Sequence, residues 1–169
     1  MQKRAIILVI SMSAIFLFAS CATNKGVTSK ATVNLVNYTN QGILMIAELE
    51  QKSLDRYASV TGENYTTDQK IYNELNDFII PTYKRFVDGL RAITPEDADI
   101  QRVHAIYINA AELMYNGFKT KMIGIENKDE AIIMQANENI EKARGECKRW
   151  RLELIELYKK YGVAETGSK

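Results

Sequence analysis

His104 is the side chain best suited to hold a metal or move a proton, and it is the single histidine among 169 residues. A carboxylate-bridged di-iron bundle needs a Glu-x-x-His pattern on two helices, but the residue three before His104 is Gln101. A structural zinc site needs four ligands, which would have to be recruited from scattered carboxylates. We therefore predict no metal site, and we expect His104 to bond to a neighbouring group at a helix surface or core edge.

A haem group could be held between helices by His104 and a methionine, for which Met45, Met114 and Met122 are the candidates. The Cys-x-x-Cys-His pattern of covalent haem attachment is absent from the sequence. Because methionines on a helical stripe usually fill the core, we predict no cofactor. A periplasmic carrier that binds haem or another small apolar ligand between its helices remains the alternative function.

The thiol of Cys147 is a second candidate for chemistry. It lies one helical turn from both Ala143 and Trp150, in a run of regularly spaced apolar residues, which favours a buried and unreactive thiol. Proximity in space to His104 stays open at this point. The sequence contains no glycine-rich phosphate loop and no Gly-x-Ser-x-Gly motif. We therefore predict that the protein is not an enzyme and has no catalytic residues.

The composition restricts the partners of the chain. The formal net charge is +1, so there is no basic excess to neutralise phosphates, and we predict no nucleic-acid binding. The length fits one domain with a core of its own. Nine tyrosines are spread along the sequence. We expect most of them to place the ring at the core edge with the hydroxyl in water, and tyrosine is also enriched in protein-protein contacts.

The beginning of the sequence has the layout of an export signal. Lys3 and Arg4 precede an uncharged run over 5–19, which is shorter than the about 20 apolar residues that a membrane-spanning helix needs. The segment Leu17-Phe18-Ala19-Ser20-Cys21 then places two small residues before a cysteine. This segment resembles the lipobox of bacterial lipoproteins, in which the cysteine carries a diacylglyceryl group and becomes the first residue of the mature chain.

The resemblance implies that Cys21 is the lipidation site and that the protein is anchored in the cell envelope. Phe18 departs from the leucine that is commonest at its position. Ala22 rather than aspartate follows the cysteine, which resembles the outer-membrane sorting pattern of bacteria with two membranes. The implied partners are the membrane, through Cys21, and an envelope protein of unknown identity.

Helical periodicity fills the rest of the chain, and no stretch shows the sustained alternation of a strand. We predict a signal peptide over 1–20, a polar tether over 21–30, a helical bundle over 31–162 and a frayed tail over 163–169. Four helices are expected in the bundle: one over 31–59, one that opens with a capping box from Thr66 to Gln69, one capped by Thr94 and ended by a left-handed Gly124, and one from a cap at Asn127 with Glu130 to Gly162.

The last of these helices has the most regular pattern. Its apolar residues follow heptad spacing, which is typical of a seam packed against neighbouring helices: Ile133, Ala136, Ile140, Ala143, Cys147, Trp150, Leu154, Leu157 and Tyr161. Pro81 predicts a kink or break near 77–80 in the second helix. Because short loops force neighbouring helices to run antiparallel, the sequence predicts an all-α, up-down-up-down four-helix bundle.

A bundle of this kind behind a lipidated cysteine resembles small helical lipoproteins of unknown function. The sequence therefore favours a lipid-anchored envelope lipoprotein with a structural or protein-interaction role and without catalysis.

Overall fold

The computed structural model describes residues 29–163, which fold as helices joined by short loops, with no strand in that range. The elements form four rods. The first is α1 (Lys30–Asn37), a π-helical turn (Tyr38–Ile43) and α2 (Leu44–Ala58); the second is α3 (Asp68–Glu74), a π-helical turn (Leu75–Ile79) and α4 (Ile80–Ala92); the third is α5 (Ala98–Asn127) and the fourth is α6 (Glu130–Lys160). A short 3₁₀ turn (Gly62–Asn64) lies between the first two rods.

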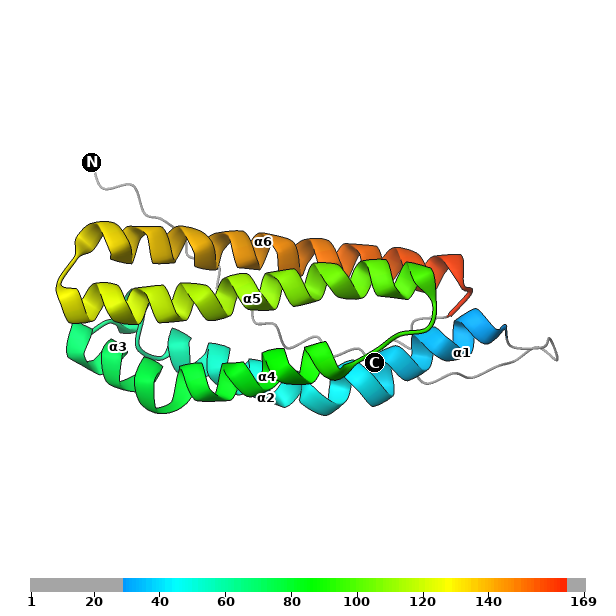
Figure 1. Ribbon diagram of the computed structural model, residues 1–169, viewed down its shortest axis with the longest axis horizontal. Helices are drawn as coiled ribbons and strands as arrows, with labels where there is room; N and C mark the ends of the chain where they lie inside the picture. The colour runs from blue at the N-terminus through cyan, green and yellow to red at the C-terminus, as the bar shows by residue number, and fades with distance from the viewer. Residues whose placement is uncertain (1–28, 164–169) are drawn as a thin grey trace.

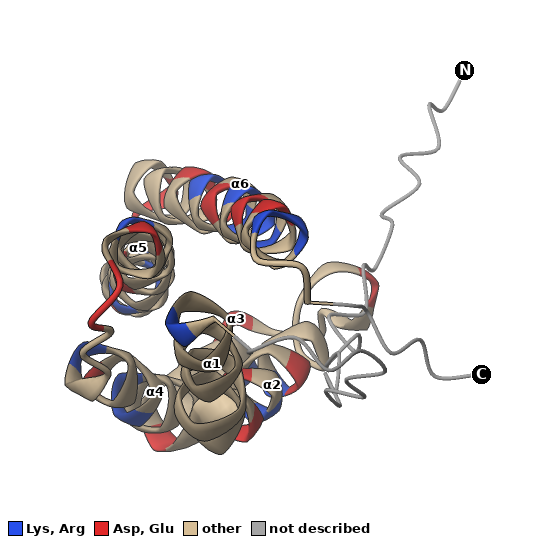
Figure 2. Cartoon of the chain, turned by 90° about the vertical axis from the view of Figure 1, so that its right-hand side faces the viewer, with Lys and Arg blue, Asp and Glu red and all other residues tan. Residues whose placement is uncertain are grey.

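The rods pack as an antiparallel bundle, which confirms the predicted fold class (Figure 1). Contacts run from α2 to α4, from α4 to α5 and from α5 to α6, and α1 contacts α6. Seen end-on, the rods are arranged around a common centre (Figure 2). Their buried side chains form one hydrophobic core there. We call the end where α1 begins and α6 finishes the entry end, and the end where α5 turns into α6 the far end. The chain between α2 and α3 also lies at the far end (Figure 1).

Aromatic side chains fill the core. Tyr83, Tyr107 and Tyr158 are fully buried, and Tyr38 and Tyr57 are nearly so. The expectation that most tyrosine hydroxyls reach water is therefore wrong for these five. The rings of Tyr38, Tyr83 and Tyr107 make edge-on contacts with a histidine or phenylalanines. Several of the five hydroxyls bond to polar groups that are buried with them, which reduces the cost of removing them from water.

A π-helical turn precedes Pro81 at the position where the sequence predicts an irregularity. The amide of Ile80 donates to the carbonyl of Leu75, five residues back, instead of four. The wider turn accommodates a proline ring that has no N–H and would collide with a regular preceding turn. A second π-helical turn, over Tyr38–Ile43, was not expected. There the amide of Leu44 donates to Thr39, and the Thr39 hydroxyl donates to the carbonyl of Leu35.

Small residues bring α5 and α6 close together. A Cβ atom added to Gly117 would lie 2.7 Å from Ile140 Cγ1, and one added to Gly124 would lie 2.9 Å from the backbone nitrogen of Ile133. Both distances are too short for real atoms, so these two glycines set the separation of the helices. Every residue of the predicted heptad seam on α6 is buried or half-buried, which confirms its inward face.

Two predicted helix starts, those of α3 and α5, are displaced. The second rod begins one residue later than expected, with Thr67 rather than Thr66 accepting the amide of Lys70. The helix α5 is capped by Asp97 and not by Thr94, because the Asp97 carboxylate accepts two amides, from Asp99 and Ile100.

The turn between α5 and α6 is also built from other residues than predicted. Gly124 does not end α5 but faces α6, and the helix continues through Asn127. Lys128 adopts the left-handed conformation, with φ 55°, that we expected at Gly124. Asp129 then caps α6 by accepting the amides of Ala131 and Ile132, where Asn127 was predicted.

Candidate functional site

His104 lies inside the bundle, with 4% of its surface exposed. Its Nε2 is 3.0 Å from the carbonyl oxygen of Leu90, and its Nδ1 is 3.2 Å from the hydroxyl of Tyr38. A carbonyl only accepts, so Nε2 carries the proton and Nδ1 accepts from Tyr38. Burial lowers the pKa of His104, which favours this neutral ring. Both ring nitrogens of His104 thus form hydrogen bonds inside the core.

The three methionines considered with His104 lie in different surroundings. Met114 is buried in the core, Met122 is partly buried against it, and Met45 is 75% exposed on α2. Phe86 and Tyr107 belong to the core and are packed against each other at 5.6 Å between ring centroids. Within residues 29–163 no three His, Cys, Asp or Glu side chains gather to share a metal ion.

Glu50 is a buried acidic residue, and nothing in the sequence predicted its burial. It interrupts the apolar stripe of the first rod, yet only 3% of its surface is exposed. Its Oε2 accepts a hydrogen bond of 2.6 Å from the hydroxyl of Tyr107. Burial raises the pKa of the carboxyl group to about 7, against the opposing effects of the Tyr107 bond and the charge of Arg151.

Cys147 belongs to the surroundings of this carboxyl group. The residue is partly buried and packs against the core. Burial raises the pKa of its thiol to about 12, and the neighbouring Glu50 acts in the same direction. The neighbouring Trp150 ring stacks on Tyr107 with 3.8 Å between centroids. A protonated thiol beside an acid in an apolar core is a poor nucleophile.

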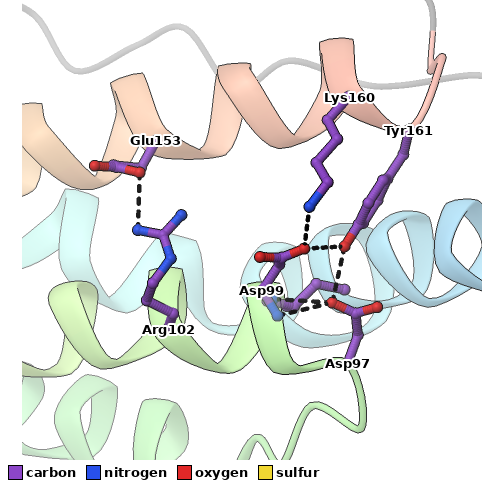
Figure 3. Close-up of polar contacts among 7 residues, drawn as sticks. Asp97, Asp99, Arg102, Glu153, Lys160 and Tyr161 are labelled. Carbon is purple, nitrogen blue, oxygen red and sulfur yellow. Dashed lines mark hydrogen bonds and ion pairs between the residues drawn. The ribbon is translucent and has the colours of Figure 1, made fainter.

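A polar cluster ties the helices together at the entry end (Figure 3). The hydroxyl of Tyr161 lies 3.0 Å from Asp97 and 2.9 Å from Asp99, and the ammonium of Lys160 bonds to Asp99. One turn further along, Arg102 forms an ion pair of 2.9 Å with Glu153. These contacts join the beginning of α5 to the last turns of α6, and one of the carboxylates, that of Asp97, also caps α5.

The same end holds the beginning of the first rod. The hydroxyl of Thr32 donates to the carbonyl oxygen of Tyr161 at 3.0 Å, and Ser29 caps α1 by accepting the amide of Thr32. Lys30 reaches Glu96 in the loop before α5 at 3.4 Å. The first described residues are therefore fixed to two other parts of the bundle.

At the far end, a hollow open to solvent lies between the rods. Its volume is about 360 Å³, and its lining includes Ile71 from α3, Lys121 and Ile125 from α5, and Ile133 from α6. Lys121 is 8% exposed and donates to the hydroxyl of Tyr57 at 2.8 Å and to Asn137 Oδ1 at 2.9 Å. Burial lowers the pKa of this lysine. Sequence reasoning missed the burial of Lys121, because it depends on contacts with Tyr57 and Asn137, which lie on other helices.

Cys21, the predicted lipidation site, lies outside the described residues, as do the proposed signal peptide and almost all of the tether. No helix over 29–163 has the length and apolar character needed to cross a bilayer. No family model, curated protein or solved structure matches this chain.

Proposed function

We propose that this chain is a lipid-anchored, non-catalytic protein of the bacterial cell envelope, held to a membrane through Cys21, that presents a rigid helical bundle to another envelope protein. The observation that carries the proposal is the segment Leu17-Phe18-Ala19-Ser20-Cys21 behind a cationic start and an uncharged run. Two or more acyl chains on one residue give firm anchoring, because each buried methylene contributes about 0.8 kcal/mol.

The position of the first described residues is compatible with attachment of the bundle to a membrane through its entry end. Seven residues, 22–28, separate Cys21 from Ser29, so the chain between them reaches at most roughly 29 Å. A lipid at Cys21 would hold the entry end near the membrane. The bonds from Thr32 to Tyr161 and from Lys30 to Glu96 would pass a force on the anchor to the rest of the bundle. The far end would point away from the membrane, on rods about 45 Å long.

Lipidation is tested by labelling bacteria that express the full chain with tritiated palmitate. We expect the label on the protein, its loss in Cys21→Ser, and movement of that variant out of the membrane fraction. Cys147→Ser is the matched control and should keep both the label and the membrane location. Equal incorporation in Cys21→Ser and in the unmodified chain would contradict the proposal.

The interaction role is tested separately in intact cells. A photoreactive residue placed at Leu152, which is exposed on α6, should form a discrete adduct of higher mass when the chain is anchored. The same label should form less of that adduct in the Cys21→Ser background, because the bundle is then no longer held beside its partner. An adduct pattern unaffected by the loss of Cys21 would show that anchoring does not serve the contact.

A further inference from the structure

The far-end hollow combines an apolar wall with a buried cation. Ile71, Ile125 and Ile133 supply apolar surface from three different helices, and Lys121 lines the same space. A volume of about 360 Å³ is within the range of small-molecule sites, which are mostly apolar with a few polar groups that orient the ligand.

Lys121 has neutral partners only. Its ammonium donates to one hydroxyl and one amide oxygen, and it lies 5.2 Å from the centre of the Tyr57 ring. Within residues 29–163 no carboxylate lies within ion-pair distance of this nitrogen, although Asp68 acts on it from further away. A buried charge without a counter-charge at ion-pair distance is costly, and a ligand that brings a negative group beside the ammonium reduces that cost.

We propose that this hollow binds a monocarboxylate with a short, branched apolar body, whose carboxylate pairs with Lys121 and whose body packs on Ile71, Ile125 and Ile133. The carboxylate could belong to a free organic acid or to the C-terminus of a peptide that ends in an apolar residue. The two sources present the same chemistry to the site. The proposal does not depend on lipid anchoring, so the two can fail separately.

The charges around the hollow favour a single negative charge over a phosphate. Arg144, which acts on Lys121 electrostatically, is already paired with Glu141 at 2.6 Å. Asp68 lines the hollow and would repel a dianion more strongly than a monoanion. Phosphate sites usually offer several cationic or amide donors, whereas the lining of this hollow contains one lysine and no arginine.

Binding is tested with isovalerate on the full chain in phospholipid nanodiscs, with carbon-13 in the isoleucine Cδ1 methyl groups. We expect saturable shifts of the Ile71, Ile125 and Ile133 methyl signals. Isovaleramide has the same body without the charge and should bind at least about tenfold more weakly, since bonds to charged groups are the stronger ones. An acetylated Gly-Gly-Leu peptide with a free carboxylate, compared with its C-terminal amide, distinguishes the peptide source from the free acid.

Two substitutions have opposite expected effects. Lys121→Gln keeps a donor for Asn137 but removes the charge, and it should weaken isovalerate binding at least about tenfold. Asp68→Asn should strengthen it several-fold, because a repelling charge at the hollow is removed. Lys119→Gln, an exposed lysine two residues away on α5, is the matched control and should leave binding unchanged.

The proposal is overturned by any of three results. These are the absence of saturable shifts at millimolar isovalerate, equal binding of isovalerate and isovaleramide, or unchanged binding in a folded Lys121→Gln variant. If Lys121→Gln does not fold, the Asp68→Asn variant decides, and weaker or equal binding there overturns the proposal.

Discussion

The hydroxyl of Tyr107 lies 2.6 Å from Glu50 Oε2 in the middle of the bundle and joins α5 to α2. This bond stabilises the ionised form of Glu50, but burial has the larger effect, and the net result is a carboxyl group with a pKa of about 7. Tyr83 and Cys147 face the same acid, and Arg151 acts on it from α6. The core of this protein therefore contains an acid that changes its charge near neutral pH.

Stability should decrease with pH because of Glu50. Its pKa is higher in the folded chain, about 7, than the ordinary value of 4.5, so the folded chain holds a proton that the unfolded chain has lost between these pH values. The stability that this proton gives is complete below pH 4.5 and is lost as the pH rises through about 7. Glu50→Gln should therefore be more stable than the unmodified chain at about pH 8, by up to about 3 kcal/mol. Urea unfolding of both proteins, at about pH 8 and again below pH 4.5, measures the difference in their free energies of unfolding.

Glu48→Gln is the control for this experiment, because Glu48 is on the same helix but exposed and paired with Lys52 at 2.8 Å. It should not reproduce the gain at high pH. If Glu50→Gln shows the same pH dependence as the unmodified chain, Glu50 is not the group responsible.

Gly124→Ala should destabilise the protein. The added Cβ would lie 2.9 Å from the backbone of Ile133, so α5 and α6 would have to separate, at a cost of about 1–3 kcal/mol. Gly145→Ala is the matched change, because Gly145 is also helical but has no atom within 4 Å of an added Cβ. Alanine has a higher helix propensity than glycine, so Gly145→Ala should stabilise the protein by about 0.5–1 kcal/mol. Thermal unfolding of both variants should give shifts of opposite sign.

Tyr161→Phe should loosen the entry end. The change removes the hydroxyl that joins α6 to Asp97 and Asp99, which should cost about 1 kcal/mol and speed hydrogen exchange in the last turn of α6. Tyr65→Phe removes a hydroxyl bonded to the nearby, exposed Asp68 and should change stability by less than about 0.5 kcal/mol. Unchanged exchange in Tyr161→Phe would show that the ion pairs alone hold this end.

Cys147 should resist alkylation in the folded chain. With a thiol pKa of about 12, little thiolate is present at neutral pH, so iodoacetamide should modify Cys147 at least about a hundredfold more slowly than in urea. Mass spectrometry of the peptide that contains Cys147 follows the reaction independently of Cys21. Similar rates in the folded and unfolded chain would contradict the burial of the thiol.

The fold could be predicted because its determinants are periodic. The heptad spacing from Ile133 to Tyr161 marks the face of α6 that packs inward, and the lack of an N–H at Pro81 marks the irregular turn before it. Helix ends were less predictable, since several residues near each end can serve as caps. Gly124 shows the difficulty, because a glycine near the end of a helix suits a left-handed cap and a close helix contact equally well.

The polar groups of the core could not be predicted from the sequence. Glu50 and Lys121 are ordinary charged residues by type, and both are buried because partners far along the chain, Tyr107 and Tyr57, meet them in the folded bundle. Such pairings depend on the packing of several helices and leave no local pattern. The tyrosines were misjudged for the same reason, since the partners of their hydroxyls lie on other helices.

The bond from Thr32 to the carbonyl of Tyr161 places the start of the first rod beside the finish of the last one. A fluorescent protein or epitope fused after the final residue of an anchored chain would thus emerge on the bilayer side. To report from the far end of the bundle, a label must be inserted into one of the two loops at that end, around Gly62 or Lys128. Terminal fusions and internal insertions would consequently sample opposite ends of the same molecule.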